Sequence, residues 1–256
     1  MATRTATPLG APVWIDLATS DLGGAQAFYR TVFGWDLEVA GPEYGGYVNA
    51  LRDGQYVGGL MASDPAWNAP SAWTVYLHTA DIQATIDAAV AAGATNCVPA
   101  IEVPEKGWMA MLTDPTGASV GLWQPTGHQG FGVVDAAGAP VWFQLTTNDF
   151  AKATDFYTKV FGWQLQVEAD SDEFRYSNAV FDGEPLIGVM DGSVIPGLEG
   201  STWSCFLGSA DVDKTIELVT ANGGSVVRGA EDTPYGRLAA VTDPAGAAFN
   251  LSSLKA

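Results

Sequence analysis

Residues 28–35 read Phe-Tyr-Arg-Thr-Val-Phe-Gly-Trp, and residues 156–163 repeat this stretch as Phe-Tyr-Thr-Lys-Val-Phe-Gly-Trp, 128 positions later. The same offset relates the segment 14–21, from a Trp to an Asp, to the segment 142–149. An offset this constant indicates two copies of one fold in tandem. A residue that the fold requires should therefore occur in both copies, whereas a residue found in one copy is freer to serve function.

Each half is predicted to contain two similar units. In the first unit a strand at 13–19 precedes a helix that Ser20 or Asp21 caps and that ends at Gly34. The remaining elements follow from alternation, helical spacing and turn signals such as Asp53-Gly54. They are strands near 36–40, 46–51 and 56–62, then a strand at 73–79, a helix at 82–92 and strands near 95–98, 108–112 and 118–123. The order is β-α-β-β-β in each unit, so the sequence predicts an α+β fold of four βαβββ modules.

The size and composition of the chain suit two compact domains. It has 256 residues, of which 47% are hydrophobic, enough for two cores of ordinary domain size. We expect a first domain over residues 1–124 and a second over 140–256. The stretch 125–139 between them is rich in glycine and is predicted to be a linker.

The charge excludes some classes of partner. The net charge is −18, and such a surface repels nucleic acid and anionic membranes. The first residues lack an apolar targeting segment, so we expect a cytoplasmic protein with no membrane partner. Its cysteines, Cys97 and Cys205, are not equivalent positions of the repeat, which argues against a disulfide framework. The fused repeat favours a monomer, with a dimer as the alternative.

Three motifs together resemble the vicinal oxygen chelate superfamily, which contains glyoxalase I, extradiol dioxygenases and bleomycin-resistance proteins. They are Leu-x-x-x-Asp at 17–21, Phe-Tyr…Phe-Gly-Trp at 28–35, and Asp-Pro-x-Gly at 114–117, which recurs at 243–246. The resemblance covers nearly the whole chain and looks closest to the tandem actinobacterial members. It implies curled mixed sheets that form cups, each able to hold a substrate and, in the metal enzymes of the superfamily, a divalent ion.

The resemblance also implies where metal ligands would stand. The first ligand lies seven residues before the Asp that caps each helix, and the second lies four residues after the turn glycine or at the matching place of the other modules. Divalent transition metals need imidazole, carboxylate or thiolate ligands. No such residue stands at these positions, so we expect a protein without metal or other cofactor. The positions are Trp14, Thr74, Trp142, Ser204, Gly121 and Asn250, with Gly59 and Gly188 at the remaining two.

Alternation along the strands predicts what lines the cups instead, because residues two apart face the same side. The first half then offers three candidate catalytic residues, Asp16, Tyr76 and His78. Their partners in the repeat cannot exchange protons near neutral pH, and this difference suggests that one cup carries the activity. The candidate ligand-binding residues are Trp14, Tyr47, Asn49, Met61, Thr74, Trp123, Trp142, Gln144, Ser204, Phe206 and Asn250.

Each candidate also has a structural alternative. Trp14 recurs as Trp142, which is equally consistent with a shared packing role. Asp16 could simply hydrogen-bond a backbone amide, and His78 could be a half-exposed strand residue. We interpret His128, in the linker, as structural.

Three functions are compatible with these residues. The first is a metal-independent protein that binds a hydrophobic, aromatic or polyketide-like molecule for sequestration or delivery. The alternative is a metal-free enzyme of secondary metabolism that uses Asp16, Tyr76 and His78 for cyclisation, isomerisation or assisted hydroxylation. The third is an interaction protein whose cups are filled by its own side chains. The sequence also leaves open whether modules pair within each half or across the halves.

Overall fold

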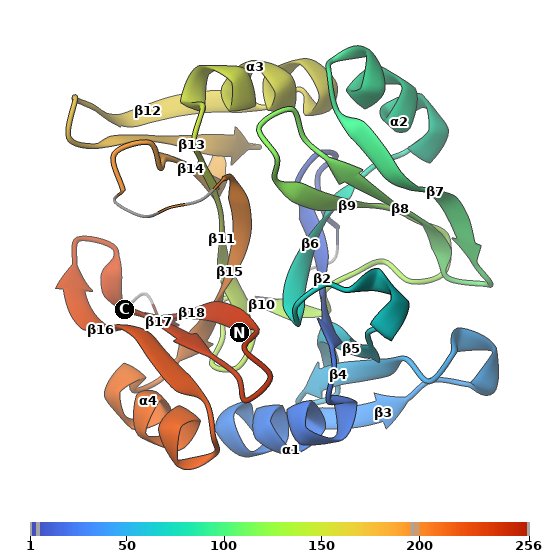
Figure 1. Cartoon of the computed structure of the whole chain (residues 1–256), viewed down its shortest axis with the longest axis vertical. Helices are drawn as coiled ribbons and strands as arrows, with labels where there is room; N and C mark the ends of the chain where they lie inside the picture. Colours follow the sequence, from blue (N-terminus) through green and yellow to red (C-terminus); the bar gives the residue numbers. More distant parts are fainter. Residues whose placement is uncertain (1, 4–5, 196–197, 199, 255–256) are drawn as a thin grey trace.

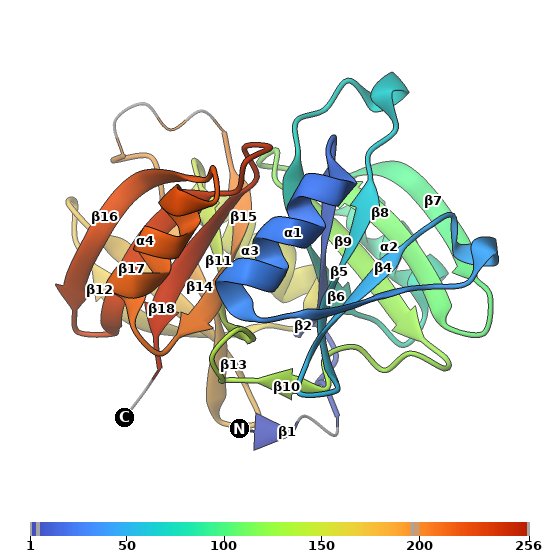
Figure 2. The same cartoon turned by 90° about the horizontal axis from the view of Figure 1, so that it is seen from below.

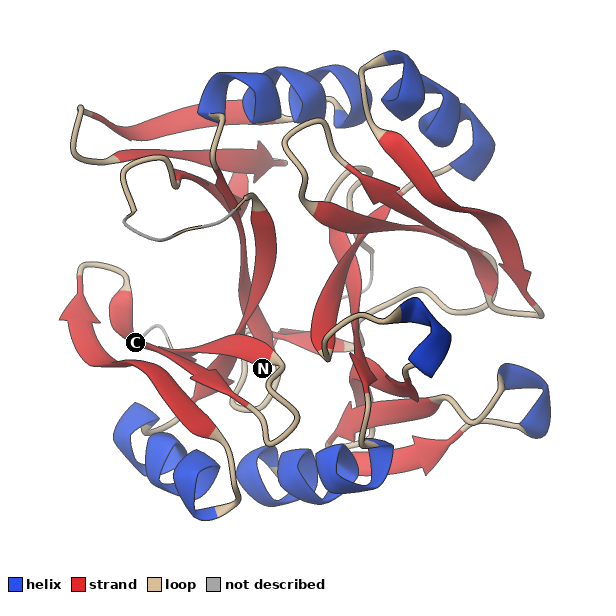
Figure 3. Ribbon diagram, viewed as in Figure 1, coloured by secondary structure: helices blue, strands red, loops and turns tan. Residues whose placement is uncertain are grey.

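The computed structural model describes residues 2–3, 6–195, 198 and 200–254. Within this part of the chain, two eight-stranded mixed sheets and four α-helices account for most of the fold. Figure 1 shows the sheets standing back to back, each bent into a U that opens away from the other. The helices lie at the two ends of the molecule and the strands between them (Figure 3). The predicted α+β fold of four βαβββ modules is confirmed.

Each sheet belongs to one half of the chain. The first runs β3 (Asp36–Val39), β4 (Val48–Arg52), β5 (Gln55–Ala62), β2 (Pro12–Thr19), β6 (Ala72–His78), β9 (Ser119–Pro125), β8 (Gly107–Thr113) and β7 (Thr95–Val103). The second runs β12 (Gln164–Asp170), β13 (Arg175–Phe181), β14 (Glu184–Asp191), β11 (Pro140–Thr147), β15 (Thr202–Ser209), β18 (Ala248–Ser253), β17 (Gly236–Thr242) and β16 (Ser225–Thr233). The modules of each half join through an antiparallel central pair, β2 with β6 and β11 with β15. Modules therefore share a sheet within each half.

The four helices begin at the predicted capping aspartates. They are α1 (Leu22–Phe33), α2 (Ile82–Ala91), α3 (Phe150–Phe161) and α4 (Val212–Ala221). At the start of α1, for example, the Asp21 carboxylate accepts a hydrogen bond from the Gly24 amide. At the other end, Gly34 adopts the left-handed backbone conformation and ends the helix. Two single-turn 3₁₀ helices, η1 (Pro42–Tyr44) and η2 (Pro65–Trp67), lie in loops. Among the described residues, no helix has the length and apolar character needed to cross a bilayer.

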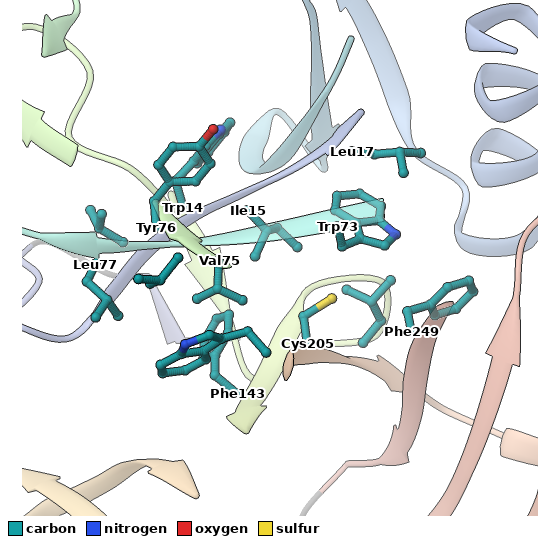
Figure 4. Packing of buried hydrophobic residues seen from close by; sticks show 14 of the residues in the cluster. Trp14, Ile15, Leu17, Trp73, Val75, Tyr76, Leu77, Phe143, Cys205 and Phe249 are labelled. Carbon is teal, nitrogen blue, oxygen red and sulfur yellow. The ribbon is translucent and has the colours of Figure 1, made fainter. Parts of the chain in front are cut away.

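The outer faces of the two sheets form the core between the halves. Figure 4 shows Ile15 and Val75 of the first half on the same side as Phe143 and Cys205 of the second, all of them buried. The helices also pack across the halves, α1 with α4 and α2 with α3. Figure 2 shows α1 lying beside α4. Strands therefore pair only within each half, whereas helices pack against each other between the halves.

The segment that joins the halves is packed against the protein. Its strand β10 (Val133–Val134) pairs with β1 (Ala2–Thr3), and Phe131 is buried. The backbone amides of Thr126, Gly127 and His128 all donate to the Lys106 carbonyl. This segment is thus a fixed wall of the first half.

Candidate functional site

The inner face of the first sheet, which we call the first cup, carries the predicted site residues in two neighbouring rows. Strand register defines these rows, because residues paired across neighbouring strands project to the same side. One row runs Asn49, Gly59, Asp16, Thr74 and the next runs Trp14, Tyr76, Gly121, Met111. Figure 4 shows Trp14 and Tyr76 pointing away from the core that contains Val75 and Cys205.

Asp16 is the buried carboxyl at the centre of this face, with 7% of its surface exposed. Burial raises the pKa of Asp16 to about 7, and hydrogen bonds donated by the hydroxyls of Tyr76 and Tyr47 limit the rise. The Trp14 indole Nε1 donates to the Tyr47 hydroxyl at 2.8 Å and so orients it. The carboxyl is therefore poised to gain or lose a proton near neutral pH.

The two tyrosines stay protonated. Burial raises the pKa values of Tyr47 and Tyr76 well above that of free tyrosine, and the negative charge of Asp16 adds to the rise. Both hydroxyls thus act as donors toward an ionised Asp16. Together the three side chains form a hydrogen-bonded group in which the Asp16 carboxyl accepts from the Tyr47 and Tyr76 hydroxyls.

Glycines make room for these tyrosines. A Cβ atom on Gly59 would overlap the Tyr47 hydroxyl, and one on Gly121 would overlap the Tyr76 ring. These glycines stand where the family resemblance places metal-binding carboxylates. In this chain the space that such a side chain would occupy is taken by a tyrosine.

The donor chemistry of the first cup does not fit a divalent transition metal. The expected ligand positions Trp14, Thr74, Gly59 and Gly121 offer no imidazole, carboxylate or thiolate. Tyr47 and Tyr76 would have to ionise to serve as ligands, and their raised pKa values oppose this. Across the described residues, no group of three or more His, Cys, Asp or Glu is arranged to hold a metal ion.

His78 lies apart from the Asp16 group. It follows Thr74, the pairing partner of Asp16, by four residues of strand, or about 13 Å at 3.3 Å per residue. Its Nδ1 donates to the Thr7 carbonyl at 2.7 Å, and the Pro8 carbonyl lies 3.3 Å away. The structure therefore brings Asp16 and Tyr76 together with Tyr47, while His78 holds the N-terminal segment.

His128 is a cup residue that the sequence analysis did not identify. Its ring meets Trp14 edge-on at 4.4 Å between centroids, with Tyr56 at 5.1 Å and Trp123 at 5.9 Å. Burial, with a smaller contribution from Lys106, lowers the pKa of His128 to about 4, so the ring is neutral. No sequence signal indicated this contact, and only the structure shows that a Cβ on the neighbouring Gly127 would overlap the Glu105 carbonyl. That glycine permits the close approach that seats His128.

The first cup is largely covered by its own side chains. Trp14, Asp16, Tyr76 and Trp123 are all buried. The half-buried residues around them are Tyr47, Asn49, Met61, Thr74, Met109 and Met111. Two surface hollows, of about 220 and 420 Å³, lie elsewhere, beside α4 and beside η2. Entry of a ligand therefore requires side chains over Asp16 to move.

The inner face of the second sheet, which we call the second cup, repeats the geometry with neutral groups. Its rows are Asn178, Gly188, Gln144, Ser204 and Trp142, Phe206, Asn250, Ala240. The Trp142 indole donates to the Tyr176 hydroxyl at 3.2 Å, which donates to Gln144 Oε1 at 3.3 Å. An amide thus replaces the Asp16 carboxyl, and Phe206 replaces Tyr76.

Comparisons with known proteins agree with this architecture. The model of the Glyoxalase/Bleomycin resistance protein/Dioxygenase superfamily matches residues 11–122 and 139–251. CFP32 of Mycobacterium tuberculosis, named as a candidate glyoxylase, is 32% identical over 98% of this chain and 97% of its own. The anthracycline biosynthesis protein DnrV of Streptomyces peucetius is 29% identical over 96% and 94%.

A solved structure shows the same fold at much lower identity. The Mn(II)-bound glyoxalase from Novosphingobium aromaticivorans superposes with a TM-score of 0.67 at 13% identity, covering 97% of this chain and 83% of that one. At this identity the likeness concerns the fold alone.

Proposed function

The chain belongs to the Glyoxalase/Bleomycin resistance protein/Dioxygenase superfamily, and on this premise we propose that it is a metal-independent protein of secondary metabolism whose first cup receives an aromatic or polyketide-like small molecule. The relative named for anthracycline biosynthesis supports this class of ligand. So does the lining, because Trp14, Tyr76 and Trp123 present aromatic surface on one face. Such rings favour planar ligands by stacking.

One observation carries the proposal. The places from which metal enzymes of this fold would direct carboxylates into the cup are glycines, Gly59 and Gly121, and tyrosines fill them. Binding therefore has to come from aromatic contact and from the hydrogen-bonding groups of Asp16, Tyr47 and Tyr76.

The titration of Asp16 favours a second candidate, a metal-free enzyme. A carboxyl with a pKa of about 7 is half ionised at neutral pH and can accept a proton from a weakly acidic C–H or O–H group. The hydroxyls of Tyr47 and Tyr76 would stabilise the ionised carboxylate before the transfer. Isomerisation needs only such proton transfers, and the same carboxyl returns the proton to the product. In a cyclisation of the aldol type the carbanion left by proton removal would also attack a carbonyl carbon of the same molecule, and the carboxyl would return its proton to the resulting alkoxide.

Elemental analysis of untagged protein tests metal independence. We expect less than one transition metal per chain and no effect of a chelator on ligand binding. Binding is followed by quenching of tryptophan fluorescence with an uncharged hydroxyanthraquinone, since Trp14 and Trp123 lie on the cup face. One tightly bound metal per chain, lost together with binding, would refute the proposal.

A further inference from the structure

We propose that the connection between β3 and β4, residues 40–47, is a lid over the first cup, and that Tyr47 leaves Asp16 when this lid opens. The proposal rests on the proposed function for the presence of a ligand, whereas the lid itself is a property of the free protein. Because Asp16 and the rings around it are buried, a route for a ligand into this cup has to be created by movement.

A contact between the two opposite edges of the first sheet holds the lid shut. The Tyr44 hydroxyl donates to the Pro104 carbonyl at 3.0 Å, and the Lys106 ammonium lies 5.7 Å from the centre of the Tyr44 ring. Tyr44 follows β3 at one edge, and Pro104 and Lys106 lie in the turn between β7 and β8 at the other. In a flat sheet of eight strands these edges would stand roughly 34 Å apart. The sheet therefore curls until the two tips meet across the mouth of the cup, and Figures 1 and 2 show both tips at the same end of the molecule.

The side of this contact that belongs to β7 and β8 is fixed. The Lys106 carbonyl accepts hydrogen bonds from the backbone amides of residues 126–128. The last of these residues, His128, places its ring against Trp14 with 4.4 Å between ring centroids. The turn is thus tied to the segment that walls the first cup. Opening of the contact therefore requires the other side, residues 40–47, to move.

Residues 40–47 form a small loop that can move as one unit. The Ala40 amide donates to the Tyr47 carbonyl at 2.8 Å, which joins the two ends of the loop. Gly45 and Gly46 have φ values of 64° and 81°, and a Cβ added to either would meet no heavy atom of the described structure within 4 Å. The half-buried aromatic side chains of the loop are Tyr44 and Tyr47. Through them the loop contacts the opposite edge of the sheet and the Asp16 group.

Tyr47 links the position of the lid to Asp16. Its hydroxyl donates to the Asp16 carboxyl and accepts from the Trp14 indole at 2.8 Å. Its hydroxyl end also lies against Gly59, where a Cβ would overlap it. Only Gly45 and Gly46 separate Tyr44 from Tyr47 after the clasp. Movement of the loop therefore withdraws one hydrogen-bond donor from Asp16 and uncovers the carboxyl, and closure over a ligand restores the donor.

The second half has no equivalent of this lid. Its connection between β12 and β13 is residues 171–174, four residues without a glycine, where the first half has eight. The Ser171 hydroxyl donates to the Phe174 carbonyl at 3.1 Å, and the Phe174 amide donates back to that hydroxyl. This connection is a tight turn. The longer loop thus occurs only in the copy that carries Asp16, as expected of a feature that serves function rather than the fold.

Thiol labelling of the free protein tests the lid without a ligand. Thr74→Cys and Ser204→Cys place a thiol at equivalent, half-buried positions of the two cups, and Cys97→Ser removes the exposed native thiol. The rate of reaction with dipyridyl disulfide, an uncharged aromatic reagent, reports how often each cup opens. Tyr44→Phe removes the hydrogen bond to Pro104 and should speed labelling of the Thr74→Cys protein about 2- to 10-fold. It should leave the Ser204→Cys protein unchanged.

Two further variants separate the clasp from general loosening. Tyr44→Ala also removes the ring beside Lys106 and should speed labelling of the Thr74→Cys protein more than Tyr44→Phe does. Tyr235→Phe, in the equivalent turn of the second half, should have no effect. Circular dichroism of each variant verifies folding. The inference is overturned if neither Tyr44 variant changes the labelling of the Thr74→Cys protein, or if both cups respond equally.

Binding kinetics connect the lid to the proposed function. In stopped-flow fluorescence with the hydroxyanthraquinone, Tyr44→Phe should raise the association and dissociation rate constants by the same factor, about 2- to 10-fold. The dissociation constant should not change, because the clasp is weakened equally in the free and the occupied closed states. Faster labelling without any binding of the hydroxyanthraquinone would refute the proposed function and leave the lid in place. Binding at rates that do not depend on Tyr44 would refute the lid and leave the proposed function.

Discussion

The Tyr157 hydroxyl donates a hydrogen bond to the Asp114 carboxylate, with 2.9 Å between Oη and Oδ2, and so ties helix α3 of the second half to a turn of the first. The equivalent hydrogen bond runs in the opposite direction between the halves, because the Tyr29 hydroxyl of α1 donates to Asp243 Oδ2 of the second half at 3.3 Å. All four side chains are buried. The aspartates of the two Asp-Pro turns thus connect the halves as well as shaping the turns.

Tyr157→Phe should lower the free energy of unfolding by about 1–3 kcal/mol, because it leaves two buried polar groups without this partner. These are Asp114 Oδ2 and the Trp203 indole, which donates to the Tyr157 hydroxyl at 2.9 Å. Urea denaturation measures the change. Tyr29→Phe should behave alike, and Tyr235→Phe, at an exposed position, is the control. An unchanged midpoint for both buried variants would show that the tie does not stabilise the protein.

Asp16 should make the wild-type chain less stable as pH rises. Its pKa is about 7 in the folded state and near 3.8 in the unfolded state, so between these values the unfolded chain loses a proton that the folded chain keeps. The contribution is fully favourable below pH 3.8, declines up to pH 7 and is constant above. Between pH 3.8 and pH 7 this titration should lower the free energy of unfolding by an amount on the order of 4 kcal/mol.

Asp16→Asn removes this titration. The stability of the variant relative to wild type should therefore increase from pH 4 to pH 7 in urea denaturation, and level off at higher pH. The comparison has to be made with wild type at each pH, because His128, with its lowered pKa, adds a slope of opposite sign between about 4 and 6.5. A difference that does not vary with pH would mean that Asp16 is ionised in the folded protein throughout.

If the protein is an enzyme, Asp16→Asn should abolish turnover and leave ligand binding nearly intact, because the amide keeps the shape and cannot accept the proton. Gln144→Ala in the second cup should have a much smaller effect on rate. Steady-state kinetics with the binding assay separate the two effects. Equal losses from both variants would place the proton transfer elsewhere.

Gly121→Ala should be more damaging than Gly59→Ala. The Cβ at 121 meets ring atoms of the buried Tyr76, whereas the Cβ at 59 meets the far end of Tyr47, which is half-buried and can move. We expect a loss of about 1–3 kcal/mol for the first and less for the second, measured by thermal denaturation. The reverse order would indicate that Tyr76 is free to shift.

Trp14→Ala should destabilise the protein by about 3–5 kcal/mol, since Trp14 is buried against Tyr56, His128 and Phe131. Trp142→Ala should lower stability less, because Trp142 is half-buried. Equal losses, measured by urea denaturation, would contradict the difference in packing between the cups.

Local patterns in the chain were sufficient to predict the modules. Each helix begins at its aspartate, and in α1 and α3 the glycine after Phe-Tyr…Phe ends the helix, because capping and positive φ depend on a few neighbouring residues. Strand phase likewise placed Asp16 and Tyr76 on one face. Strand phase also placed His78 on this face of the sheet, but it does not say how far His78 lies from Asp16 along the strands. The hydrogen bond to Thr7 shows that His78 belongs to another contact.

The repeated sequence by itself determined the tandem fold, its caps and the neutral character of the second cup, because these depend on residue type and short-range spacing. Only the tertiary structure decided that Tyr47 and Tyr76 meet at Asp16, that His128 reaches Trp14, and that Tyr157 binds Asp114. These contacts join residues that lie 31 to 114 positions apart in the chain, where neither periodicity nor propensity carries information. They arise from the curl of each sheet and from the packing of the halves, which place distant side chains within hydrogen-bonding distance.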